Sequence, residues 1–217
     1  MRRRFDSEIP QAYARLCEMR AAARTDLLTV ELGELARALA ASRPGGVFLC
    51  TGDGAGEPGA WMLDGMDLSS RLVVVVGDRR EAERLRAVLG DDLRVTVHRQ
   101  DAVAFLEDVH DHRFDLIADL SAEPPARRLE LALARLAPGG LFLTRCPADV
   151  VEASLGGSRG AGAEPADTDT GAFVPARFAQ PLDATLIARR PQPPAGKRRG
   201  GRRARAGVTP LFSSKTR

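Results

Sequence analysis

The stretch "GVFLCTGDGAGEPGAW" (residues 46–61) joins a short apolar run to three glycines at alternate positions, Gly52, Gly54 and Gly56. Glycine adopts positive φ without strain, and because it has no Cβ it lets backbone amides approach a ligand closely. The loop therefore has two interpretations: a cofactor-binding loop, or a tight strand-to-helix turn with no ligand. The glycines alone do not distinguish them.

Around this stretch, short apolar runs alternate with segments of helical pattern. The runs predicted as strands are residues 47–50, 71–77, 93–97, 114–120 and 141–145, and the predicted helices between them are residues 59–66, 80–89, 102–109 and 126–136. Strands that are apolar throughout, each followed by a helix, indicate a mostly parallel sheet covered on both faces. Right-handed crossovers make this a doubly wound, Rossmann-like α/β fold.

The two ends of the chain differ from this core. Residues 10–24 and 29–42 have the spacing of two amphipathic helices, which we expect to cover a cofactor or form a homodimer surface. After the fifth strand, residues 147–171 are rich in Gly, Ala and acids and predict a mobile loop. Residues 172–178 and 184–189 predict an antiparallel strand pair. One domain, residues 1–190, would then precede a disordered basic tail, residues 191–217.

The composition excludes several classes of protein. A hydrophobic share of 44% and a charged share of 28% are typical of a soluble globular protein, and no apolar run reaches the roughly 20 residues of a membrane helix. The basic N-terminus lacks the apolar segment of a secretory signal, and Cys17, Cys50 and Cys146 are too few and too scattered for a disulfide framework or zinc site. We expect a cytoplasmic protein without membrane contact.

The net charge of +3 conceals a division along the chain. Residues 189–217 hold ten Lys or Arg and no acid, so the remaining 22 basic and 29 acidic residues give the rest a net charge of −7. An acidic fold is a poor binder of phosphate backbones, whereas the basic segment 197–205 can make weak, non-specific contact with nucleic acid. The alternative is a solvated terminus, which its single aromatic residue, Phe212, favours.

Three further features favour the cofactor interpretation of the glycine loop. Asp78 ends "VVVVGD" about 20 residues past the glycines, where doubly wound cofactor domains place an acid on ribose hydroxyls. Gln100 and Asp101 follow the third strand, at the edge where open α/β sheets bind ligands. "LAPGG" stops a helix before the fifth strand. Together they point to a nucleoside cofactor without a pyrophosphate.

With these pieces in order, residues 27–189 resemble the class I S-adenosylmethionine-dependent methyltransferases, in particular the bacterial O-methyltransferase family related to catechol and caffeoyl-CoA methyltransferases. The matching motifs are "GDGAG" with "AWML", "VVVVGD", "RQDA", "FDLIADL" and "LAPGG". The resemblance implies S-adenosylmethionine as the cofactor and a small-molecule acceptor. It places the glycines at the methionine part, Asp78 at the ribose, Asp101 and Ala102 at the adenine, and Thr29 at the cofactor carboxylate. The predicted cofactor-binding set is Thr29, Gly52, Asp53, Gly54, Gly56, Asp78, Gln100, Asp101 and Ala102.

The sequence also departs from that family. The acid that usually ends the first strand and holds the cofactor amino group aligns with Cys50, and the usual ribose acid aligns with Val76, two residues before Asp78. Where catechol-type relatives bind a divalent cation, this chain has Leu120 after strand four and Arg145 with Cys146 after strand five. A hard cation prefers several oxygen ligands, so we expect no metal. Asp119 is the carboxylate nearest the predicted methyl-transfer position and the candidate catalytic base.

Other residues that could carry chemistry have simpler interpretations. His110 and His112 lie in a polar loop predicted at the amino end of the sheet, away from the cofactor, and His98 is expected to be a packed or edge residue. Trp61 is expected to be core. Two functions follow: O-methylation of a small molecule, or a degenerate, non-catalytic binding or scaffold protein whose tail contacts RNA or acidic partners. The acceptor is not identified, because residues 1–25 and 147–171 are expected to surround it.

Overall fold

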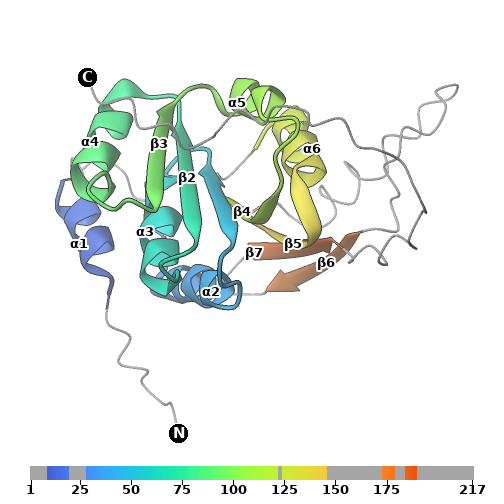
Figure 1. Ribbon diagram of the computed structural model, residues 1–217, viewed down its shortest axis with the longest axis horizontal. Helices are drawn as coiled ribbons and strands as arrows, with labels where there is room; N and C mark the ends of the chain where they lie inside the picture. The colour runs from blue at the N-terminus through green and yellow to red at the C-terminus, as the bar shows by residue number, and fades with distance from the viewer. Residues whose placement is uncertain (1–8, 20–27, 122–123, 146–172, 179–183, 190–217) are drawn as a thin grey trace, which may run out of the picture.

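Alternating strands and helices build one sheet with helices on both faces (Figure 1). The computed structural model describes residues 9–19, 28–121, 124–145, 173–178 and 184–189, so the predicted loop 147–171 and tail 191–217 lie outside the described residues. The helices are α1 (Gln11–Glu18), α2 (Val30–Ala41), α3 (Gly56–Gly65), α4 (Arg79–Leu89), α5 (Ala102–Asp108) and α6 (Ala126–Ala134). The strands are β1 (Val47–Thr51), β2 (Arg71–Val76), β3 (Val95–Arg99), β4 (Phe114–Asp119), β5 (Leu136–Thr144), β6 (Phe173–Phe178) and β7 (Ala184–Arg189). No described helix is long and apolar enough to cross a membrane.

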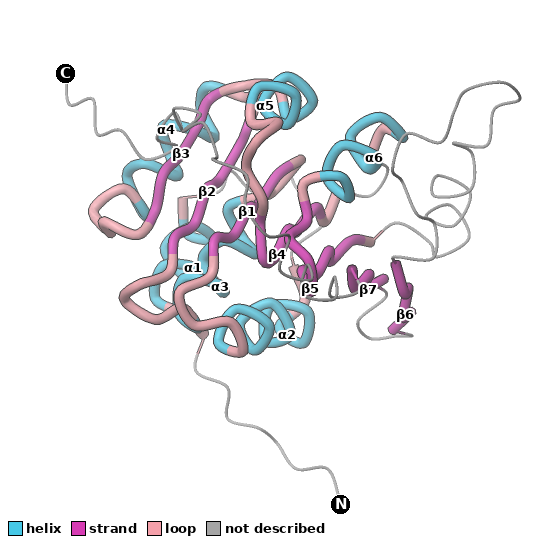
Figure 2. Tube along the Cα trace, turned by 45° about the vertical axis from the view of Figure 1, so that its right-hand side comes forward, coloured by secondary structure: helices cyan, strands magenta, loops and turns pink. Residues whose placement is uncertain are grey.

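The strands form a seven-stranded sheet in the order β3-β2-β1-β4-β5-β7-β6. β3 to β5 are parallel, whereas β7 pairs antiparallel with both β5 and β6, at the end of the sheet far from β3 (Figures 1 and 2). This order confirms the predicted doubly wound fold and the predicted antiparallel pair. The chain reverses its direction across the sheet between β1 and β4, which makes their carboxyl ends a topological switch point.

Two apolar cores cover the two faces of the sheet. One core packs α1, α2, α3 and α4 around the buried Trp61, Phe48 and Leu85. The other packs α5 and α6 against Leu49, Ile117 and Phe142. Alternate residues of a strand point to opposite faces, so β1 divides its side chains between the two cores. Trp61 is completely buried and its ring centroid lies 5.4 Å from that of Tyr13, which confirms its core role.

Several strand and helix boundaries differ from the prediction. α3 begins at Gly56 instead of residue 59, because Glu57 N donates to Gly54 O at 3.0 Å and Pro58 is tolerated in a first helical turn. β3 begins at Val95 instead of residue 93, since Leu93 is 96% exposed in the preceding turn. α6 ends at Ala134 instead of residue 136, and β5 begins at Leu136 instead of residue 141. β5 pairs with β4 from Leu136 onward, with an irregularity in the pairing register.

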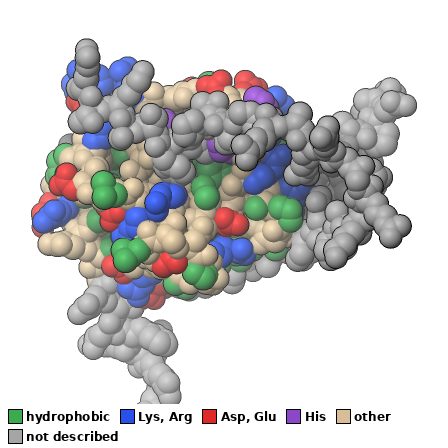
Figure 3. Space-filling model, viewed as in Figure 1, with side chains coloured by type: hydrophobic (Ala, Val, Ile, Leu, Met, Phe, Trp, Pro, Cys, Tyr) green, Lys and Arg blue, Asp and Glu red, His purple; other side chains and the backbone are tan. Residues whose placement is uncertain are grey.

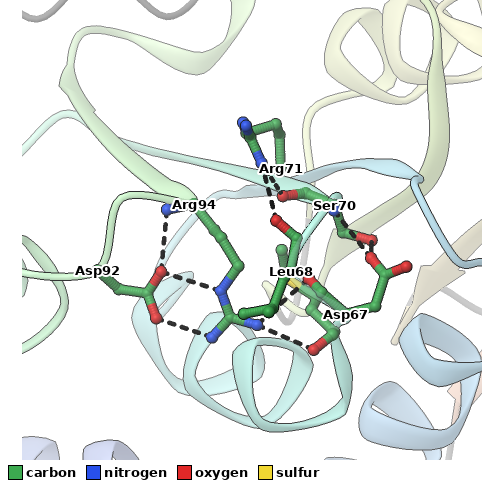
Figure 4. A network of polar contacts seen from close by, with 7 residues as sticks. Asp67, Leu68, Ser70, Arg71, Asp92 and Arg94 are labelled. Carbon is green, nitrogen blue, oxygen red and sulfur yellow. Dashed lines mark hydrogen bonds and ion pairs between the residues drawn. The ribbon is translucent and has the colours of Figure 1, made fainter.

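A polar network ties the loops at the amino ends of β2 and β3 together (Figure 4). The Arg94 guanidinium binds the Asp92 carboxylate at 2.7 Å and donates to Met66 O at 2.9 Å. Asp67 accepts from Gly45 N at 3.1 Å and from Ser70 N at 2.8 Å. Hydrogen bonds from Ser70 and Gly45 lower the pKa of Asp67 to about 2. This network stabilises the edge opposite the carboxyl ends.

Candidate functional site

The predicted cofactor residues gather at the carboxyl ends of β1, β2 and β3, beside the switch point. The glycine loop follows β1, Asp78 follows β2, and Gln100 and Asp101 follow β3. Because the carboxyl ends of parallel strands share one edge of the sheet, these residues come from three separate parts of the sequence to a common edge. Thr29 arrives from the start of α2, which packs on α3.

The three glycines of the loop differ in backbone conformation and in how closely they are packed. Gly52 (φ 87°) and Gly54 (φ 76°) both have the left-handed backbone that favours glycine. A Cβ on Gly52 would lie 2.2 Å from Ser121 Oγ, and a Cβ on Gly56 would lie 2.1 Å from a Leu85 methyl, so both positions are closely packed. Among the described residues, nothing lies within 4 Å of a Cβ on Gly54. Gly54 thus presents its backbone to open space, and Gly77 after β2 does the same.

The loop is fastened to β4 through a residue that the sequence analysis did not single out. Asp53 N donates to Ser121 Oγ at 3.0 Å, across 68 residues of sequence. Ser121 N in turn donates to Asp119 Oδ1 at 3.1 Å. A small hydroxyl residue two positions past an acid at a strand end was the available signal, but its partner could not be identified from the sequence.

Asp119, the predicted catalytic base, is held by a second residue that the sequence analysis missed. Arg128 of α6 approaches Asp119 Oδ2 with its Nε at 2.7 Å and Oδ1 with its Nη2 at 3.4 Å. The Asp119 side chain is only 1% exposed. Burial raises the pKa of Asp119 above its ordinary value, while Arg128 and Ser121 oppose that rise. A base role for Asp119 stays a prediction.

Three predicted cofactor residues are helix N-caps. Thr29 Oγ1 accepts from Leu32 N at 3.3 Å at the start of α2. Asp78 Oδ1 accepts from Glu81 N at 2.8 Å at the start of α4. Asp101 Oδ1 accepts from Val103 N at 2.9 Å and from Ala104 N at 3.0 Å at the start of α5. Capping explains these residue types without a ligand, yet both aspartates are exposed and their caps use only Oδ1.

The remaining predicted residues border the same edge. Gln100 Nε2 donates to Asp108 Oδ2 at 2.6 Å, and its backbone N donates to Val76 O at 3.1 Å. Ala102 begins α5 and is buried. Asp53 is exposed in the glycine loop. The Gln100 side chain is thus hydrogen-bonded to α5, and its backbone N–H to β2.

Cys50 is completely buried beneath this edge. Its Sγ lies 3.5 Å from Met62 Sδ in α3. Burial raises the pKa of the Cys50 thiol, with a smaller contribution from Asp119, so the thiol is neutral. A neutral thiol within the core cannot supply the negative charge that an acid would bring here.

A buried carboxylate does lie nearby, at Glu57 in the first turn of α3. Glu57 Oε2 accepts from Leu28 N at 2.9 Å, and Tyr13 Oη donates to Leu28 O at 3.0 Å. Both backbone groups of Leu28 are therefore held, which fixes the neighbouring Thr29 next to the glycine-loop helix. The sequence analysis did not single out Glu57, because nothing local marks its contact with a residue 29 positions away.

Several solved structures that match this chain are methyltransferases. The chain is similar to a methyltransferase from Geobacter sulfurreducens, with a TM-score of 0.63 and 21% identity over 85% of this chain and 92% of that one. It is similar to an O-methyltransferase from Bacillus cereus in complex with SAH, with a TM-score of 0.59 and 18% identity over 85% of this chain and 93% of that one. A SAM-dependent O-methyltransferase from Thermotoga maritima matches with a TM-score of 0.58 and 17% identity over 87% of this chain and 74% of that one.

The chain has the class I methyltransferase fold. No family model matches the sequence, and no curated protein does. Identities this low establish the methyltransferase fold alone, so activity has to be argued from the site.

The described residues at this edge suit a nucleoside cofactor better than a metal ion. Buried Thr51 Oγ1 has no hydrogen-bond partner among them, Gly54 and Gly77 face open space, and Asp78 and Asp101 are exposed carboxylates. The described residues contain no group of three His, Cys, Asp or Glu that could hold a metal ion. Asp119 has both oxygens engaged by Arg128, and Leu120 is buried in the core. Cys146 lies outside the described residues.

The histidines lie where the sequence predicted. His110 and His112 occupy the turn between α5 and β4, at the amino end of the sheet, and His112 N donates to Val109 O at 3.0 Å. His98 packs its ring 5.2 Å from the Phe105 ring, and burial lowers its pKa. Basic and acidic side chains are interspersed over the described part of the face shown in Figure 3. None of these features competes with the carboxyl edge as the candidate site.

Proposed function

We propose that this protein is an S-adenosylmethionine-dependent methyltransferase that methylates an oxygen atom of a small molecule without a bound metal ion. The observation that carries the proposal is the open backbone of Gly54 at the switch point, on the same edge of the sheet as the exposed carboxylates of Asp78 and Asp101. The SAH bound to the Bacillus cereus protein supports the choice of cofactor.

Each residue would have a separate task in this site. Gly54 would admit the methionine part of the cofactor, Asp78 Oδ2 would accept from a ribose hydroxyl, and Asp101 with Ala102 would border the adenine. Thr29 would bring the amide groups at the start of α2 to the cofactor carboxylate. The cofactor supplies a methyl group on a sulfonium, a good leaving group, so alignment of the acceptor oxygen does most of the work.

Calorimetric titration with S-adenosylmethionine and S-adenosylhomocysteine tests the proposal. We expect binding by the wild type and no measurable binding by Gly54→Val, because a side chain there would fill the open space. Gly139→Val is the matched control: Gly139 has φ 78° and open space around its Cβ position, as Gly54 does, but lies in the amino-terminal half of β5. Absence of wild-type binding at millimolar cofactor would refute the proposal.

The second candidate is a non-catalytic binding protein with a methyltransferase fold. Its support is the neutral, buried Cys50 and the use of Thr29, Asp78 and Asp101 as helix caps. This candidate predicts no cofactor binding and salt-sensitive RNA binding that weakens on truncation after Arg190. Equal RNA binding by the full and truncated chains would rule out a role for the tail.

A further inference from the structure

The Asp119 carboxylate connects three elements that are separate in the sequence. Arg128 reaches it from α6, at 2.7 Å from Oδ2. Ser121 N donates to Oδ1 at 3.1 Å, and Ser121 Oγ accepts from Asp53 N at 3.0 Å. A continuous polar path therefore runs from α6 through the end of β4 to the glycine loop. We refer to Arg128, Asp119 and Ser121 as the latch.

The latch is almost wholly removed from solvent. The exposed fractions of the Asp119 and Arg128 side chains are 1% and 13%. Among the described residues, every hydrogen bond or ion pair of the Arg128 side chain goes to Asp119. A buried carboxylate that loses its charged partner is costly, so Arg128 stabilises Asp119 in its position.

The latch is also in tight contact with the loop itself. A Cβ at Gly52 would lie 2.2 Å from Ser121 Oγ and 2.5 Å from Asp119 Oδ1. The next peptide along the loop gives its N–H to Ser121, and Gly54 follows with its open backbone. The orientation of the peptide that faces the proposed cofactor thus depends on where Ser121 and Asp119 sit.

We propose that Arg128, Asp119 and Ser121 are positioning residues that hold the glycine loop in its binding conformation before any ligand arrives. Arg128 supplies the positive charge beside the buried Asp119 carboxylate. Asp119 then holds Ser121, and Ser121 holds the Asp53 amide. This arrangement holds the glycine loop in place in the free protein. Its effect on cofactor affinity rests on the proposed function.

Amide hydrogen exchange at Asp53, measured by NMR on the free full-length protein, tests the latch directly. We expect exchange at this amide to become at least about tenfold faster in Arg128→Gln and in Ser121→Ala, as for the loss of one hydrogen bond. Arg127→Gln is the matched control, because the neighbouring Arg127 side chain is 60% exposed and pairs with Glu107. Arg128→Lys, which keeps the charge, should restore part of the protection.

Binding of S-adenosylhomocysteine to the same variants is the second measurement. We expect Arg128→Gln and Ser121→Ala to weaken it about tenfold or more, and Arg127→Gln to leave it unchanged. A catalytic base acts on the acceptor and would not change this affinity in the acceptor's absence, so the loss distinguishes a latch from a base.

The outcomes separate the two proposals. Unchanged exchange at Asp53 in both Arg128→Gln and Ser121→Ala overturns the latch, whether or not the protein binds the cofactor. If exchange at Asp53 becomes faster in these variants but their cofactor affinity is unchanged, the latch has no role in cofactor binding. If the wild type binds no cofactor, the proposed function fails, and Asp53 exchange still decides whether the loop is latched.

Discussion

A methyl group added to Gly52 tests the packing of the glycine loop against β4. Gly52, Gly54 and Gly139 all have φ between 76° and 87°, so alanine at any of them adopts an unfavourable backbone. The surroundings differ. In the part of the chain that the structure describes, nothing lies within 4 Å of a Cβ at Gly54 or Gly139, whereas a Cβ at Gly52 meets Ser121 Oγ at 2.2 Å and Asp119 Oδ1 at 2.5 Å.

The backbone cost alone is about 1–2 kcal/mol for an L-residue in the left-handed region. Overpacking a closely fitted site costs a further ~1–3 kcal/mol, because neighbouring groups must shift. We therefore expect the free energy of unfolding to fall by about 1–2 kcal/mol in Gly54→Ala and Gly139→Ala. In Gly52→Ala it should fall by about 2–5 kcal/mol.

Equilibrium unfolding in urea, followed by tryptophan fluorescence, measures these differences, since Trp61 is the single tryptophan and is buried. The difference between Gly52→Ala and the mean of the other two variants isolates the steric contribution. If all three variants lose the same stability, the contact between the glycine loop and the end of β4 does not exist as described.

Three further predictions concern other parts of the molecule. Glu57→Ala leaves Leu28 N without its acceptor and should lower the free energy of unfolding by about 1–3 kcal/mol. Glu57→Gln keeps an acceptor oxygen and should lose less stability. Urea unfolding of both variants measures the difference, and equal losses would contradict the prediction. The pKa of Asp67, about 2 in the folded protein, lies below its ordinary value of 3.8, so its stabilising effect is present above pH 4 and disappears as the pH falls toward 2. Asp67→Asn should therefore be less stable than the wild type at pH 7, by a margin that closes toward pH 2 in thermal unfolding; a margin independent of pH would refute it. A chelator should leave any methyl transfer unchanged, because Arg128 already neutralises Asp119; activity that requires magnesium would overturn this.

Local sequence patterns predicted most of the fold for identifiable reasons. Apolar runs such as "RLVVVV" are buried on both faces, so they mark parallel strands whatever their partners. Boundaries were less accurate where the deciding interaction is a backbone hydrogen bond: the glycine loop turns into α3 at once, and β5 pairs with β4 before its Pro-Gly-Gly segment.

The cofactor role of the predicted site residues stays a prediction. Asp78 and Asp101 were singled out by their positions after strands, and Thr29 by the family resemblance; that all three are helix N-caps became visible only in the structure. Arg128 and Glu57 were missed, because arginine and glutamate on a helix are usually solvated. Their partners, Asp119 and Leu28, come from other elements.

By itself, the sequence determined the order of strands and helices, the glycine loop after the first strand and the acids that follow the next two. These features depend on the periodicity of apolar residues and on glycine's backbone freedom, which act over a few neighbouring residues. Only the tertiary structure decided that the loop is fastened by Ser121, that Asp119 is paired with Arg128 and that Cys50 faces the core. Those contacts arise where the sheet brings distant segments to one edge, and the partner of a buried charge is set by which elements pack there.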